Sequence, residues 1–171
     1  MAEFQQLHDM NVFEGMDPTL LTVRQKRSAL RAINLIKEKR CGRMKGRSVA
    51  DGRSERERYA NVDTSSPTVS NNALMMSMLI DAWEGRDVAC ADVPGAYLHA
   101  DMDSFTLIRY EGESVDIMCK INPDWEKFIT IEGGKKVLYL RLLKALYGCV
   151  KSALLWYELF VNTLQKEGFV L

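Results

Sequence analysis

The sequence predicts an α+β protein, because helical and strand patterns alternate irregularly and show no strand–helix–strand rhythm of a parallel sheet. Glycine-bounded runs rich in β-branched and aromatic residues predict strands in 32–52, 105–112 and 127–142. Longer apolar runs flanked by capping residues predict helices in 3–13, 71–84, 113–122 and 151–168. We therefore expect mixed short sheets with packed helices.

The first half of the chain begins with "EFQQLHDMNVF", a short helical pattern. In "AINLIKEKRCGRMKGRSVADG", residues 32–52, two strands flank a turn at Gly42. The polar run after them predicts a loop, and Ser70 or Asn71 then caps a helix that stops at Gly85. Because this helix has little polar face, we expect it to be buried.

The second half opens with "RDVACAD", residues 86–92, which reads as a strand ending on Asp92. A strand in 105–112, a helix up to Pro123 and a hairpin with Gly133 and Gly134 at its tip follow. From Ser152 an amphipathic helix is predicted to run to Gly168 and to bury four apolar side chains, which are Ala153, Trp156, Phe160 and Leu164.

Composition narrows the function classes. The chain has 171 residues, enough for one domain or for a piece of a larger one. No apolar run approaches the roughly 20 residues that span a bilayer, and the polar start lacks the pattern of a signal peptide. We expect an intracellular protein, cytoplasmic or nuclear, with no membrane partner. Four scattered cysteines and two histidines favour reduced, buried thiols over a zinc site or a disulfide framework.

Charge is unevenly distributed although the net charge is zero. Residues 21–60 contain 13 Lys and Arg against 4 Asp and Glu, so the rest of the chain is acidic by the same surplus. Such a split indicates that one segment faces a polyanion and that another holds carboxylates. A basic run is more often simply a solvent-exposed face of the protein.

Asp92 is the most informative single carboxylate. Before Pro-Gly, an aspartate most often caps nearby amides of a turn. At a strand end it can instead ligate Mg²⁺ that holds substrate phosphates. A second acidic pattern, Asp101 and Asp103 in "DMD", could hold Mg²⁺ with a nucleotide-sugar diphosphate, but so short a motif arises readily by chance, and the two are expected to be solvated.

Four motifs in register resemble the reverse transcriptase of copia-type retrotransposons. They are "MKGRSVADG" (44–52), "SSPTVS" (65–70), "CADVPGAYLHADM" (90–102) and "LRLLKALYGCVKSALLWYELFVNTLQKEGF" (140–169). The resemblance covers most of residues 30–171. It implies a partial right-hand polymerase fold, with about 1–68 and 104–147 forming fingers and about 69–103 and 148–171 forming palm in a single domain.

The resemblance also implies roles for individual residues. Asp92 stands at the position of the first palm aspartate, which binds the catalytic Mg²⁺ ions, with the Val93 carbonyl as a further ligand. Tyr97 stands where the family keeps an aromatic ring under the deoxyribose. Lys45 and Arg47 match the basic pair that grips the incoming triphosphate, although an ordinary solvated hairpin would also carry such charges.

At the second turn, Tyr147 and Gly148 match the segment that lines the nucleotide and template pocket. Trp156 and Tyr157 read better as core residues of the last helix. The implied partners are an RNA/DNA template-primer and deoxynucleoside triphosphates.

Two departures from the family pattern bear on activity. "VKSALL" (150–155) lacks the proline and arginine that the family has after this turn, and the family's x-Asp-Asp turn would follow only beyond Leu171. Since two-metal phosphoryl transfer needs several anionic ligands, Asp92 by itself cannot hold the metal pair. We expect a truncated or degenerate RNA-directed DNA polymerase fragment without activity of its own, or alternatively a noncatalytic nucleic-acid- or protein-binding remnant.

Overall fold

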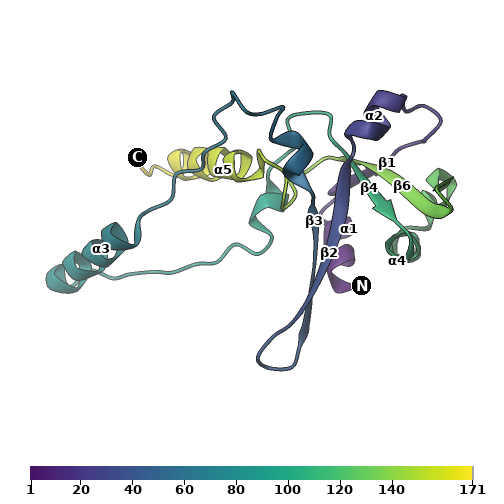
Figure 1. Ribbon diagram of the computed structural model, residues 1–171. Helices are drawn as coiled ribbons and strands as arrows, with labels where there is room; N and C mark the ends of the chain where they lie inside the picture. The colour runs from purple at the N-terminus through teal and green to yellow at the C-terminus, as the bar shows by residue number, and fades with distance from the viewer. Residues whose placement is uncertain (171) are drawn as a thin grey trace.

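A computed structural model describes residues 1–170 and contains one mixed sheet with helices around it (Figure 1). The six strands are β1 (Phe13–Gly15), β2 (Leu30–Glu38), β3 (Met44–Ala50), β4 (Leu107–Glu111), β5 (Thr130–Glu132) and β6 (Lys135–Leu142). They are ordered β1-β6-β4-β2-β3, and β5 also pairs with β6. All strand pairs are antiparallel except β2 with β4, which is parallel. The predicted α+β class is therefore confirmed.

The core lies on both faces of this sheet because side chains alternate along each strand. Leu138, Leu140 and Leu142 of β6 face a cluster under α1 (Ala2–Asp9) and α4 (Glu113–Ile121). The intervening Val137 and Tyr139 face a smaller cluster near α2 (Val23–Ser28). A buried hydrogen bond of 2.9 Å between the hydroxyls of Ser48 and Tyr110 links β3 to β4 inside the larger cluster.

Several predicted turns and caps are confirmed. Gly42, Gly133 and Gly134 adopt positive φ at the two hairpin tips, where a side chain would be strained. The helix α3 (Asn71–Glu84) begins with the Ser70 hydroxyl accepting from the Ala73 amide and ends at left-handed Gly85. The last helix, α5 (Ser152–Lys166), and the short 3-10 helices η1 (Gly52–Glu55), η2 (Ala96–His99) and η3 (Pro123–Phe128) complete the chain.

Three predictions about burial and pairing were wrong. The helix α3 is exposed rather than buried, and Figure 1 shows it held away from the sheet on two long connections. Residues 86–92 form no strand, because no other strand of residues 1–170 lies beside them. In α5, Ala153, Trp156 and Leu164 are half-buried and Phe160 is exposed.

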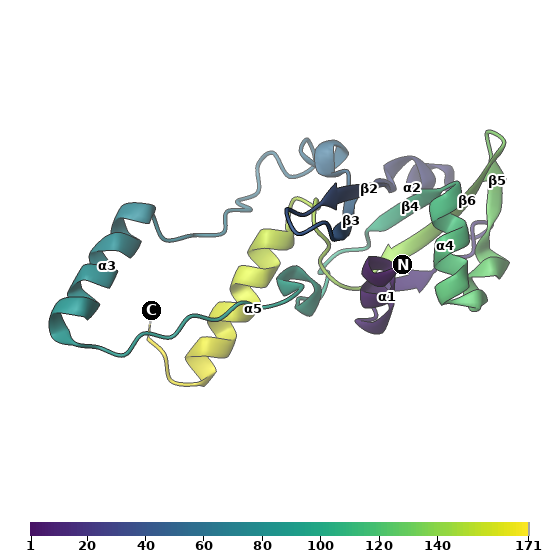
Figure 2. The same cartoon turned by 90° about the horizontal axis from the view of Figure 1, so that it is seen from below.

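The cysteines also divide differently from the prediction. Cys119 and Cys149 are buried free thiols, whereas Cys41 at the hairpin tip and Cys90 beside Asp92 are exposed. Figure 2, seen from below, shows α5 lying between the sheet and α3. No helix among residues 1–170 combines the length and apolar character that crossing a membrane requires.

Candidate nucleotide and nucleic-acid site

Two predicted motifs meet where β3 ends. The Ala50 amide donates a hydrogen bond of 2.7 Å to the Tyr147 carbonyl, which joins "SVADG" to "ALYG". Gly148 has a φ of 96°, and a Cβ there would lie 1.9 Å from the Ala50 carbonyl oxygen. A Cβ on Gly52 would lie 2.1 Å from the Gly148 oxygen. The two glycines are thus required because the two backbones touch.

Tyr97 and Tyr147 form an aromatic pair beside this junction. Their ring centroids are 4.6 Å apart, with the ring planes tilted by 37°. Tyr97 is placed by η2, which begins after Gly95 in the left-handed conformation. Both side chains are half-buried.

The charges of two more predicted residues act on Tyr147. Burial raises the pKa of Tyr147, the positive charge of Arg47 opposes that rise, and the negative charge of Asp92 adds to it. The charge of Glu3 acts in the same direction as that of Asp92, and Asp92 has the weakest effect of the three charged residues. These four residues come from three separate segments: Arg47 from β3, Asp92 and Tyr97 from the segment that leads through η2, and Tyr147 from the turn before Gly148.

Asp92 and Val93 lie in an exposed coil that leads into η2. Within residues 1–170 the Asp92 carboxylate has neither an ion pair nor a hydrogen-bond donor; the nearby side-chain bond joins His99 Nε2 and the Pro94 carbonyl. The turn-capping role that its neighbours favour is thus absent. Nor do the described residues contain a group of three His, Cys, Asp or Glu side chains able to hold a metal ion.

Lys45 and Arg47 lie on the outer face of the β2–β3 hairpin. In the hairpin, Lys37 lies opposite Lys45 and Leu35 lies opposite Arg47. Lys39 lies opposite Arg43 at the tip. Side chains of these residues share one face, because directly opposite residues of a ladder point the same way. Among residues 1–170 no carboxylate pairs with any of the five cations, which are Lys37, Lys39, Arg43, Lys45 and Arg47. Of the predicted basic pair, only Arg47 contributes to the pKa shift of Tyr147.

The "DMD" carboxylates are engaged elsewhere. Asp101 accepts from Lys144 at 2.6 Å, and Asp103 pairs with Lys151. Both pairs join the segment after η2 to the segment around Gly148. Both carboxylates are exposed to solvent, as predicted, and each is already paired with a lysine on the surface.

Two buried residues that sequence reasoning missed hold the Gly148 turn in place. The buried Glu55 carboxylate accepts from the Val150 amide at 3.1 Å, and the buried Ser152 hydroxyl donates to the Leu146 carbonyl at 2.6 Å. Burial also raises the pKa of the Cys149 thiol to about 12, so this thiol stays neutral. Glu55 stands in the charged run "RSERERY", where nothing distinguishes it from its solvated neighbours.

No protein-family model, curated protein or solved structure matches the chain. Its function is therefore argued from the residues that the fold brings together.

Proposed function

We propose that the chain is the fingers and the first part of the palm of an RNA-directed DNA polymerase of the copia retrotransposon type. The observation that carries this proposal is the contact of the Tyr97 and Tyr147 rings beside the junction of Gly148 with Ala50, where the charges of Arg47 and Asp92 also act on Tyr147. Three of the four motifs, far apart in the sequence, supply these residues.

Each member has a role that its chemistry supports. Arg47 would bind the triphosphate of a deoxynucleotide through its planar, bidentate guanidinium, and Lys45 would extend this charge along the hairpin. The Tyr97 ring, backed by Tyr147, would lie under the sugar and leave no room for a 2′-hydroxyl. Gly148 contributes by its close backbone contact with β3, which positions the Tyr147 ring.

Magnesium fits this place only in part. Asp92 and the Val93 carbonyl offer a free carboxylate and a carbonyl oxygen, the hard ligands that Mg²⁺ prefers. When bound with the remaining ligands of a complete palm, Mg²⁺ would neutralise charge on the transferring phosphoryl group. One carboxylate does not hold two ions, so we expect residues 1–171 to incorporate no nucleotide on a primed RNA template.

The second candidate is a noncatalytic binder of nucleic acid. It is favoured by the five unpaired cations on the outer hairpin face, which need only phosphates and no metal. This candidate shares the hairpin with the first but makes no use of Asp92 or Tyr97.

Equilibrium dialysis with labelled dTTP, in the presence of an RNA/DNA hybrid, separates the two. The polymerase fragment should bind dTTP only with Mg²⁺, lose most binding in Arg47→Ala and lose the Mg²⁺ dependence in Asp92→Asn. Tyr97→Ala should narrow the preference for dTTP over UTP, because the ring acts by exclusion. If the chain binds the hybrid but shows no Mg²⁺-dependent binding of dTTP, the polymerase proposal is contradicted and the noncatalytic binder is supported.

A further inference from the structure

The Gly148 turn is held from both sides by one continuous stretch of chain. Before the glycine, the Tyr147 carbonyl accepts from the Ala50 amide at 2.7 Å. After it, the Val150 amide donates to Glu55 Oε2 at 3.1 Å. Because η1 follows β3 after a single residue, the end of β3 and the end of η1 clamp the turn between them.

Glu55 is an unusual residue to find in this clamp. Its side chain is buried, with 7% of the residue exposed, and no Lys or Arg of residues 1–170 pairs with it. Its neighbours Arg56, Glu57 and Arg58 are all exposed. A buried carboxylate without a cation opposes folding, and features that oppose folding are expected mainly where function needs a fixed geometry.

The clamp acts on the aromatic pair. The Tyr147 ring lies between the two clamped points of the turn, and it contacts the Tyr97 ring with a centroid distance of 4.6 Å. Tyr97 comes from η2, and its hydroxyl makes no hydrogen bond within residues 1–170. Its ring therefore depends on Tyr147 for support, and a displaced turn would change that support.

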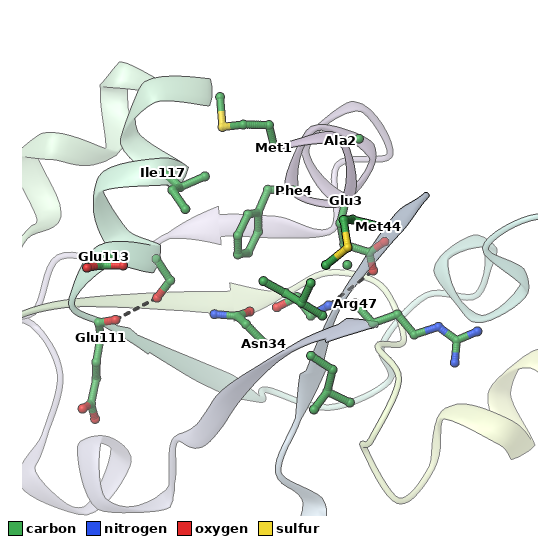
Figure 3. A pocket seen from close by; sticks show the side chains of 15 residues that line it. Met1, Ala2, Glu3, Phe4, Asn34, Met44, Arg47, Glu111, Glu113 and Ile117 are labelled. Atoms are coloured by element: carbon green, nitrogen blue, oxygen red, sulfur yellow. Dashed lines mark hydrogen bonds between the residues drawn. The ribbon is translucent and has the colours of Figure 1, made fainter. Parts of the chain in front are cut away.

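Glu3 makes a similar contact on another side of β3. Its Oε1 accepts from the Ser48 amide at 3.3 Å. Figure 3 shows Glu3 on the wall of a cavity of about 660 Å³ beside Gly46, formed by α1, the β2–β3 hairpin and the start of α4. Neither Tyr97 nor Tyr147 lines this cavity. Glu3 thus offers a carboxylate-to-amide contact with β3 that does not hold the turn.

We propose that Glu55 is a positioning residue for sugar selectivity. By holding the Val150 amide it fixes the Gly148 turn, and through Tyr147 it keeps the Tyr97 ring where a 2′-hydroxyl would lie. Glu55 itself touches no nucleotide. The selectivity part of this inference rests on the proposed function, whereas the positioning of the turn does not.

The test applies two measurements to the full chain. Amide hydrogen exchange, followed by NMR, reports the Ala50 bond to Tyr147. Equilibrium dialysis with Mg²⁺ and an RNA/DNA hybrid reports the preference for dTTP over UTP. Glu55→Ala should speed exchange of the Ala50 amide about tenfold and lower the dTTP preference about fivefold, because the Val150 amide loses its buried acceptor and the turn loosens. Glu55→Gln keeps an oxygen acceptor and should restore both values.

Glu57→Ala, at the exposed acidic neighbour, is the matched control and should change neither value. Glu3→Ala should leave the dTTP preference unchanged, because the turn keeps its contacts. If Glu55→Ala does not fold, Glu55→Asp replaces it, since the shorter carboxylate does not reach the Val150 amide.

The proposal is overturned if Ala50 exchange is unchanged when Glu55 is shortened, or if exchange rises while the dTTP preference stays the same. A parent chain that binds no dTTP contradicts the proposed function and, with it, the role in sugar selectivity. The exchange rates then still decide whether Glu55 positions the turn, so the two failures are distinguishable.

Discussion

Gly148 is the residue at which the hairpin and the following turn meet, and its backbone leaves no space for a side chain. A Cβ would overlap the Ala50 carbonyl oxygen, and the positive φ adds strain of its own. Glycine is therefore required at position 148 by the contact between two backbone segments, whether or not a ligand binds beside the turn.

We expect Gly148→Ala to lower the free energy of unfolding by about 3 kcal/mol or more, because the overlap must be relieved by moving β3 or the turn. Gly42→Ala is the control, since it has positive φ but nothing within 4 Å, and should cost only about 1 kcal/mol. Urea denaturation measures both. Equal losses in the two variants would show that φ alone, and not the contact, sets the cost.

Cys41 is the second residue whose surroundings predict behaviour. The Arg43 Nε lies 3.4 Å from its sulfur and lowers the pKa of this exposed thiol. The thiolate is the form of cysteine that reacts with alkylating reagents. Because its pKa is lowered, Cys41 should become reactive at a lower pH than an ordinary cysteine.

Alkylation with iodoacetamide, followed by peptide mass spectrometry across a pH series, tests this effect. Cys41 should react with a midpoint below the ordinary range of a cysteine thiol, and Arg43→Gln should move that midpoint upward. Cys149 should stay unmodified until the protein unfolds, because it is buried and its pKa is raised. An unchanged midpoint in Arg43→Gln would contradict the role of the guanidinium.

The β2–β3 hairpin is the element with the clearest electrostatic cost. Lys37 and Lys45 are directly opposite each other, and like charges across a ladder destabilise it. A polyanion on this face would turn the repulsion into a favourable contact, since each phosphate releases a counterion on binding.

Lys37→Glu separates stability from binding. It should stabilise the free protein by about 0.5 kcal/mol, by making an opposite-charge pair with Lys45, and should weaken binding of an RNA/DNA hybrid. The salt dependence of binding should also become shallower. Lys120→Glu, exposed on α4, is the control and should do neither. Tighter hybrid binding in Lys37→Glu would remove the hairpin from the nucleic-acid interface.

Helix α3 is the feature of the whole molecule that differs most from an ordinary folded domain. Met76, Leu79 and Trp83 are 64%, 71% and 91% exposed, on a helix with hardly any polar face. Exposed apolar surface of this extent is a site of association.

We therefore expect the chain to self-associate as its concentration rises, with sedimentation velocity as the measurement. Leu79→Lys with Trp83→Lys should shift the distribution toward monomer, because charge on α3 opposes its burial against another molecule. Leu20→Lys, at an equally exposed site outside α3, should not. A parent chain that stays monomeric and unfolds cooperatively at every concentration would mean that α3 is not the associating surface.

What the sequence predicts well is what neighbouring residues decide. Gly42, Ser70 and Gly85 fix turns and caps through their own backbone geometry, and the strands around Gly42 and Gly133 follow from local alternation. Burial and pairing depend on distant partners, so the expectations for α3 and for residues 86–92 failed. The candidate site shows the same division.

Within that site, the motifs named Arg47, Asp92, Tyr97, Tyr147 and Gly148 separately, and the structure adds the contact of the Tyr97 ring with Tyr147 and that of Gly148 with Ala50. Glu55 could not be found, because its importance arises from a single amide nearly a hundred positions later in the chain. The cavity beside Gly46 could not be found either, since its walls come from α1, the β2–β3 hairpin and the start of α4, which are far apart in the sequence.

The connections on either side of α3 also determine how the chain would withstand cleavage. Residues 63–70 and 86–93 are exposed coil without regular structure, and extended exposed segments are the preferred sites of proteolysis. A cut in each would release α3, yet the two remaining pieces would stay joined. The parallel pairing of β2 with β4, the Ala50–Tyr147 hydrogen bond and the Glu55–Val150 hydrogen bond all connect one piece to the other. A nicked protein would therefore keep its sheet and its Gly148 turn, and residues 63–93 would behave as a removable insert.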